Sequence, residues 1–120
     1  MSLAGSSYNT DPELEWRAFY LIEVMKYLGY PVRITESFRS SERQQELYAV
    51  GRTQPGAILT HARPGSSPHE FGRAIDITFL GPGYSAPDSW WNLAGEVGEW
   101  LGLRWGGRFK GFRDRPHFEI

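Results

Sequence analysis

A single acidic residue interrupts the most apolar strand expected in this 120-residue chain. Residues 73–79 have the composition of a strand, and Asp76 lies within it between Ile75 and Ile77. Because a lone buried carboxylate is costly, the fold must give Asp76 a cation, a metal ion or a set of hydrogen-bond donors. Gly72, just before the strand, suits a tight turn or a close backbone approach beside a site. The strand therefore predicts a polar site set directly against the core.

Two histidines are candidate partners for this carboxylate. His69 ends a loop rich in Gly, Pro, Ser and Thr, and His117 begins a terminal strand directly after Pro116. Alternation along that strand turns Phe118 to the core and His117 to the opposite face. On spacing alone, an alternative stands equally well: a buried Asp76 paired to Arg73 or Arg39, with His69 an ordinary loop residue.

The absence of cysteine decides which metal chemistry the chain can offer. Any metal ion must be held by imidazole and carboxylate groups. His69, Asp76 and His117 make a set of three, and catalytic zinc sites use three such ligands with a fourth position for water. Asp114, one turn before the terminal strand, is the carboxylate expected to move the proton of that water, and Glu119 is the weaker candidate.

The pattern of helices and strands predicts a small single α+β domain, a central antiparallel sheet flanked by helices. Residues 1–10 are interpreted as a tag or a disordered terminus, and residues 11–120 as the catalytic domain. Ser41 followed by Gln44 fits a capping box, and Asp88 or Ser89 is expected to cap the third helix. The expected helices are 12–28, 41–50 and 89–101, and the expected strands are 31–38, 73–79, 103–105 and 117–120.

Charge and hydropathy exclude several kinds of partner. The net charge is −1, so no overall field would hold the chain on nucleic acid. The basic residues between 104 and 115 are interrupted by Asp114 and are expected to form a solvated loop. No apolar run is long enough to span a membrane, and no signal-peptide pattern opens the chain. We expect a monomer, with the cellular compartment left open.

The ordered motifs resemble those of the VanY-like peptidoglycan peptidases. The match consists of Ser67-x-His69-x-x-Gly72-x-Ala74-x-Asp76 followed by Asp114-x-x-His117. An arginine segment, Ser37-Phe38-Arg39-Ser40 with Gln44 and Leu47-Tyr48, also has a counterpart in that family. The resemblance extends from about residue 34 to residue 120. It implies a fold like that of D-Ala-D-Ala peptidases and hedgehog domains.

The resemblance also implies roles for individual residues. His69, Asp76 and His117 would bind one zinc ion per chain, and Asp114 would be the general base. Arg39 would bind the substrate carbonyl or carboxylate and stabilise the oxyanion. This chain has Asp at the base position, as the endopeptidase-like branch of the family does, so its shorter side chain must be brought closer to the metal.

Several further residues are assigned on weaker grounds. The resemblance makes Gln44 a substrate contact, and makes Ser67 either a support for the loop that bears His69 or a substrate contact. Trp105, followed by two glycines, is expected to line a groove or to join the core. His61 is interpreted as an ordinary loop histidine. Trp90, Trp91 and Trp100 are expected on the core face of the third helix.

The function implied is hydrolysis of stem peptides in the bacterial cell wall. The bond cut is left open between D-Ala-D-Ala, an exopeptidase reaction, and L-Ala-D-Glu, an internal one. Such enzymes act in the periplasm, outside the cell, or as cytoplasmic phage lysins released at lysis. Two alternatives remain: a catalytically silent, zinc-containing binding module of the same fold, as in hedgehog-type domains, and a metal-free structural domain. The presence of both Asp114 and Arg39 favours the enzyme.

Overall fold

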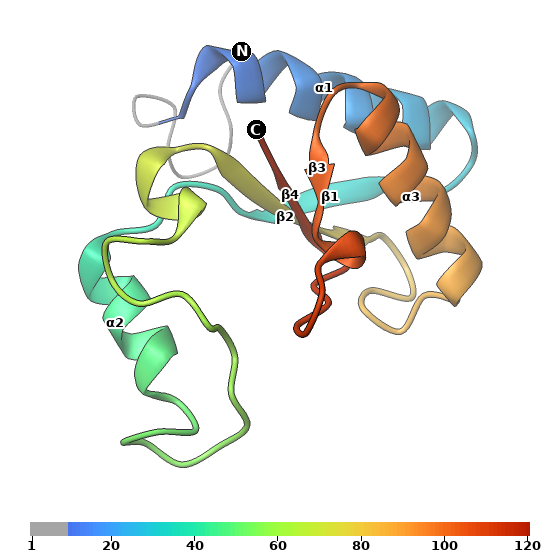
Figure 1. Ribbon diagram of the computed structural model, residues 1–120. Coiled ribbons are helices and arrows are strands. Elements are labelled where there is room, and N and C mark those ends of the chain that lie inside the picture. The colour runs from blue at the N-terminus through green and yellow to red at the C-terminus, as the bar shows by residue number, and fades with distance from the viewer. Residues whose placement is uncertain (1–9) are drawn as a thin grey trace.

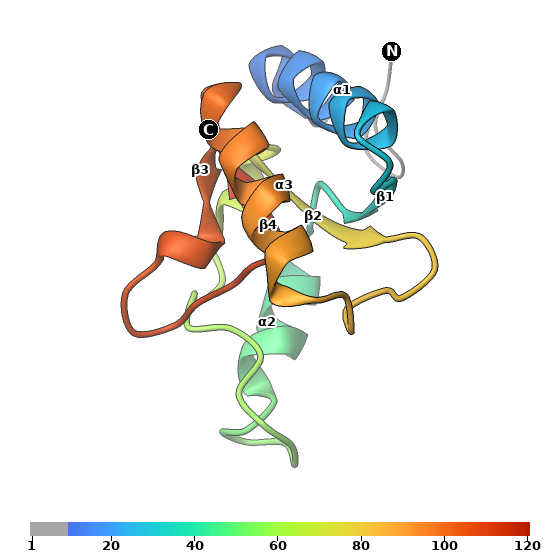
Figure 2. The same ribbon diagram turned by 90° about the vertical axis from the view of Figure 1, so that its right-hand side faces the viewer.

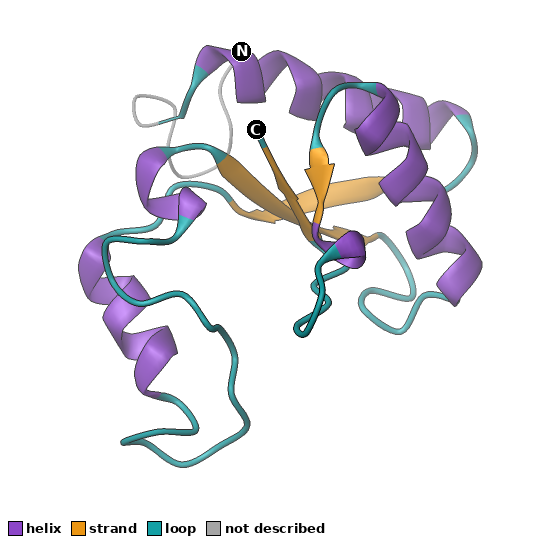
Figure 3. Cartoon of the chain, viewed as in Figure 1, coloured by secondary structure: helices purple, strands orange, loops and turns teal. Residues whose placement is uncertain are grey.

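The computed structural model describes residues 10–120 (Figures 1 and 3). Within that range the chain forms three α-helices, two short 3-10 helices and four strands. In chain order these elements are α1 (Pro12–Tyr27), β1 (Val32–Glu36), α2 (Ser41–Ala49), η1 (Pro68–Phe71), β2 (Ala74–Phe79), α3 (Asp88–Trp100), β3 (Arg104–Trp105), η2 (Gly106–Arg108) and β4 (His117–Glu119). The predicted α+β class is confirmed.

The four strands form one antiparallel sheet in the order β1-β2-β4-β3. The four expected strands are therefore present, each one or more residues shorter than expected. In β2, Asp76 lies opposite His117 of β4 on one side and opposite Glu36 of β1 on the other. This register brings Glu36, Asp76 and His117 side by side, although Glu36 and His117 are 81 positions apart in the chain. The sheet itself therefore assembles one part of the candidate site.

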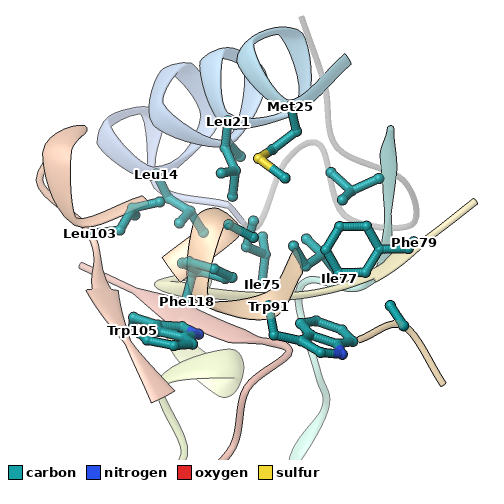
Figure 4. Close-up of a cluster of buried hydrophobic side chains, with 14 residues drawn as sticks. Leu14, Leu21, Met25, Ile75, Ile77, Phe79, Trp91, Leu103, Trp105 and Phe118 are labelled. Atoms are coloured by element: carbon teal, nitrogen blue, oxygen red, sulfur yellow. The ribbon is translucent and has the colours of Figure 1, made fainter. Parts of the chain in front are cut away.

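Helices α1 and α3 cover one face of the sheet, whereas α2 extends away from it (Figures 1 and 2). The core lies under the two helices and contains large side chains from both helices and from the strands (Figure 4). Its fully buried members include Leu14, Leu21, Met25, Ile75, Ile77, Phe79, Trp91 and Phe118. Burying each such side chain contributes about 1.5–3 kcal/mol. The opposite face of β2 and β4 is thereby left for polar groups.

Helix caps agree with the sequence at α1 and differ at the other two helices. Asp11 caps α1 as predicted, because its carboxylate accepts a hydrogen bond from Glu13 N at 2.9 Å. Helix α2 is capped by Ser40, not Ser41, through a bond from Arg43 N to Ser40 Oγ. Pro87 precedes α3 without a side-chain cap, so the prediction of an Asp88 or Ser89 cap was wrong. The proline ring holds φ of Pro87 at −57°, a value that a helix also uses.

Two of the three tryptophans expected in the core of α3 are found there. Trp91 is 1% exposed and Trp90 packs against the core, but Trp100 is 80% exposed. The buried positions of α3 recur at 91, 94, 95 and 98. Trp100 is off this stripe, which is why the prediction failed for it.

The remaining predictions about organisation concern the N-terminus and membranes. Residues 1–9 of the expected terminal segment lie outside the described residues, and Thr10 is buried, at 8% exposure. Among residues 10–120, no helix combines the length and the apolar character needed to cross a bilayer.

Candidate metal centre

Three predicted ligands converge on the sheet face that the helices leave uncovered. His69, Asp76 and His117 each offer one ligand atom, and these atoms lie within 4.8 Å of one another. The histidines approach the carboxylate symmetrically: His69 Nε2 and His117 Nδ1 are each 3.2 Å from Asp76 Oδ1. Asp76 and His117 meet because they are register partners in β2 and β4.

His69 reaches the same point from η1, which is fixed at both ends. Ser67 precedes this short helix, and its hydroxyl accepts a hydrogen bond from His69 N at 3.3 Å. Gly72 ends it with φ +66, a left-handed conformation that a glycine adopts without strain. Arg39 N also donates to His69 O at 3.0 Å, which ties the arginine segment to the backbone of the ligand. The tight turn expected at Gly72 is confirmed.

Each histidine is oriented by a hydrogen bond at its other ring nitrogen. His69 Nδ1 lies 2.8 Å from Ser37 O, and His117 Nε2 lies 2.7 Å from Glu119 Oε1. A backbone carbonyl only accepts, so His69 Nδ1 donates and Nε2 is left to face Asp76. Such outer contacts hold metal-binding imidazoles in one tautomer and one orientation. Neither Ser37 nor Glu119 was assigned this role from the sequence.

The electrostatics of the cluster are those of a site made for positive charge. Burial by itself raises the pKa of Asp76, but hydrogen bonds from His117 and His69 outweigh it and hold the pKa far below its usual range. Burial by itself lowers the pKa of His117, yet the bonds to Asp76 and Glu119 raise the pKa to about 9. The acidic groups thus attract a proton to His117, as they would attract a metal cation.

The donor set fits zinc. Two imidazole nitrogens and one carboxylate oxygen are the ligands of open, catalytic zinc sites. Ligands at about 2.0–2.1 Å from a tetrahedral ion lie roughly 3.3 Å apart, close to the 3.2 Å that separates each histidine nitrogen from Asp76. The alternative reading, an Asp76 neutralised by an arginine, is met only at Arg39, which lies 3.7 Å from Asp76. Arg73 pairs with Asp11 instead.

Asp114 faces the cluster from the loop between η2 and β4. Burial, followed by the negative charge of Asp76, raises the pKa of its carboxyl group. Its backbone is clamped, since Asp114 N donates to Gly106 O at 2.9 Å and His117 N donates to Asp114 O at 3.1 Å. A Cβ atom at Gly106 would lie 2.1 Å from Asp114 O, so the close approach requires glycine.

Arg39 is buried beside the candidate ligands, and two of its three guanidinium nitrogens are already hydrogen-bonded. Its Nε donates to Glu36 at 2.9 Å and its Nη1 donates to Gln44 Oε1 at 2.8 Å. Gln44 is completely buried, and its amide donates to Ala62 O at 2.7 Å. This contradicts the prediction that Gln44 touches substrate: the side chain lies behind Arg39 and holds it in place.

A pocket of about 500 Å³ opens over the three ligands. Arg39, Asp114, Ser67 and His61 are among its lining residues. The His61 ring packs against Phe112 at 4.5 Å between centroids and is not part of the ligand set, as expected. The full lining is Arg39, Leu47, Leu59, Thr60, His61, Ala62, Ser67, Pro68, His69, Asp76, Arg104, Phe109, Lys110, Phe112, Asp114, His117 and Glu119.

Of its two expected roles Trp105 takes the core role, and Glu119 departs from its predicted role. Trp105 does not line this pocket; it is 3% exposed and belongs to the core. The missing side chains of Gly95 and Gly107 make room for its ring, because a Cβ at either position would lie within 2.3 Å of it. Glu119, the weaker candidate for the base, is hydrogen-bonded to His117 and paired with Arg104 at 3.1 Å. Both residues support the site from outside.

Comparison with known proteins agrees with this geometry. The sequence profile of the D-alanyl-D-alanine carboxypeptidase family matches residues 60–120. The chain is 41% identical over 103 residues to the peptidoglycan L-alanyl-D-glutamate endopeptidase CwlK of Bacillus subtilis (strain 168). That alignment covers 77% of this chain and 62% of the length of CwlK.

Solved structures share the fold. The L-Ala D-Glu endopeptidase ChiX of Serratia marcescens superposes with a TM-score of 0.67 at 23% identity, over 93% of this chain and 80% of ChiX. A variant of the vancomycin-resistance D,D-pentapeptidase VanY, solved with Zn(II), superposes with a TM-score of 0.74 at 17% identity. It covers 99% of this chain and 76% of the VanY chain.

Proposed function

Since the chain belongs to the D-alanyl-D-alanine carboxypeptidase family, we propose that it is a zinc-dependent peptidase that hydrolyses the L-alanyl-D-glutamate bond of bacterial cell-wall stem peptides. The choice of this bond over D-Ala-D-Ala rests on the 41% identity to an endopeptidase of that specificity. We further propose that the protein acts as a monomer.

One observation carries the catalytic part of the proposal. Three ligand atoms, a separate carboxylate with a raised pKa and a buried guanidinium all meet in one pocket. A metal-free structural domain needs none of this convergence. A silent binding module needs the ligands but has no use for Asp114 and Arg39 in their present positions.

The chain's own residues divide the chemistry among them. His69, Asp76 and His117 would hold zinc, which supplies Lewis acidity to the attacked carbonyl and lowers the pKa of a bound water to about 7. Asp114 accepts the proton of the attacking water and returns it to the leaving amine. Arg39 Nη2, the guanidinium nitrogen that faces Asp76 at 3.7 Å, stabilises the negative charge that develops on the carbonyl oxygen.

Digestion of defined muropeptides tests the proposal. Zinc-loaded protein is incubated with a stem pentapeptide, and the new termini are identified by mass spectrometry. The proposal predicts free L-alanine carboxyl and D-glutamate amino termini, and their loss after zinc removal and in Asp114→Asn. Release of D-alanine alone would make the protein a carboxypeptidase. Absence of any cleavage would contradict the proposal.

A further inference from the structure

One wall of the pocket carries two cations that the proposed chemistry leaves unused. Arg104 and Lys110 both line the pocket that contains the three ligands. Arg104 pairs with Glu119 through one nitrogen, yet its side chain is 71% exposed. Lys110 is exposed and enters no ion pair within residues 10–120. The sequence predicted a solvated loop here, but these two side chains border the site.

Ring contacts place this wall next to a metal ligand. The Arg104 guanidinium carbon lies 5.6 Å from the centroid of the Phe109 ring. The same ring lies 5.6 Å from the His117 ring. Lys110 follows Phe109 in the chain. Arg104 is therefore linked to His117 through the Phe109 ring, and Lys110, the next residue in the chain, lines the same pocket.

Arg39 is poorly suited to bind a substrate carboxylate as well as the oxyanion. It is 9% exposed, and its Nε and Nη1 are already hydrogen-bonded to Glu36 and Gln44. The remaining nitrogen, Nη2, is the one that the proposed chemistry gives to the oxyanion. A carboxylate bound in the pocket needs N–H donors that make no other hydrogen bond. Among the basic residues that line the pocket, Arg104 and Lys110 have them.

We propose that Arg104 and Lys110 bind the free α-carboxylate of the D-glutamate whose amino group is released. The inference rests on the proposed function. In the stem peptide the chain continues through the γ-carboxyl group of this residue, so its α-carboxylate stays free on the carbon that bears the scissile nitrogen. Amidation of that group gives D-isoglutamine, which has the same shape without the charge.

Two matched peptides test this recognition: L-Ala-D-Glu-γ-L-Lys and its D-isoglutamine form. Zinc-loaded wild type is expected to have a kcat/KM about tenfold higher for the free carboxylate, the value of one charge-assisted hydrogen bond. Lys110→Met should remove most of this preference, and Lys110→Glu should reverse it. Lys26→Met, which removes an exposed lysine from α1, should leave the preference unchanged.

Binding provides a second readout. Dissociation constants of both peptides for zinc-loaded Asp114→Asn are measured by calorimetry, and the same tenfold ratio is expected. Equal kcat/KM and equal dissociation constants for the two peptides would overturn the inference while leaving the proposed function intact. Cleavage of neither peptide would contradict the proposed function, and the ratio of dissociation constants would then decide the inference alone.

Discussion

Replacing Gly106 with alanine should separate catalysis from metal binding. The added Cβ would lie 2.1 Å from Asp114 O. A Cβ atom essentially never lies within 3.0 Å of a non-bonded heavy atom, so the Asp114 carbonyl must move away by about 0.9 Å. A displacement near 1 Å costs about 100-fold in rate when it misplaces a catalytic group. Overpacking costs about 1–3 kcal/mol of unfolding free energy. The same Cβ would lie 3.0 Å from His117 Cβ, a tight contact that a shift of a few tenths of an ångström relieves, so the candidate ligands in β2, β4 and η1 should still bind zinc.

The assay compares this variant with a matched control. In Gly98→Ala the new Cβ lies 2.4 Å from the Phe118 ring, on the core side of the sheet. Both variants should lose similar stability in denaturant titrations and both should bind one zinc. Only Gly106→Ala should lose about 100-fold in kcat. Equal kcat values in the two variants would refute the view that Gly106 sets the position of Asp114.

Three other predictions follow from the same site. Because burial and the charge of Asp76 raise the pKa of Asp114 in the metal-free protein, an NMR titration of the metal-free protein should give Asp114 a midpoint above that of an ordinary aspartate. An ordinary midpoint would contradict this. Hydrogen bonds to Asp76 and Glu119 raise the pKa of His117 to about 9 without metal, so zinc binding at pH 7 should release about one proton. Calorimetry in buffers of different ionisation enthalpy measures this release. Binding heats that do not depend on the buffer would contradict the prediction. Gln44→Leu should lower the unfolding free energy by about 1–3 kcal/mol and raise KM, because Arg39 loses the side chain that holds it. Gln45→Leu, a substitution at the exposed neighbouring residue, should change neither quantity. Equal effects of the two substitutions would show that Gln44 does not position Arg39.

The three candidate ligands could be predicted because each belongs to a local sequence pattern. Asp76 stands out as a carboxylate in an apolar strand, and alternation puts His117 on the face away from Phe118. Antiparallel pairing of β2 and β4 then brings the two together. Ser67 and Gly72 fix His69 through local turn geometry, which sequence patterns also encode.

The roles that the sequence left open or predicted wrongly depend on packing between distant segments. Gln44 is a typical polar helix residue until the loop at Ala62 folds over it. Trp105 looks free beside its glycines, but the glycine in α3 at position 95 opens a slot that buries the ring. By its spacing Glu119 is a second candidate for the general base, yet its position in β4 brings its carboxylate into a hydrogen bond with His117. None of these contacts leaves a periodic signal.

We propose that two imidazoles and one carboxylate hold zinc at this point of the sheet. Anomalous diffraction at the zinc edge, from crystals of the zinc-loaded protein, tests it directly. One peak per chain is expected, within bonding distance of His69 Nε2, Asp76 Oδ1 and His117 Nδ1. A peak elsewhere, or none at these atoms despite full zinc loading, would contradict it.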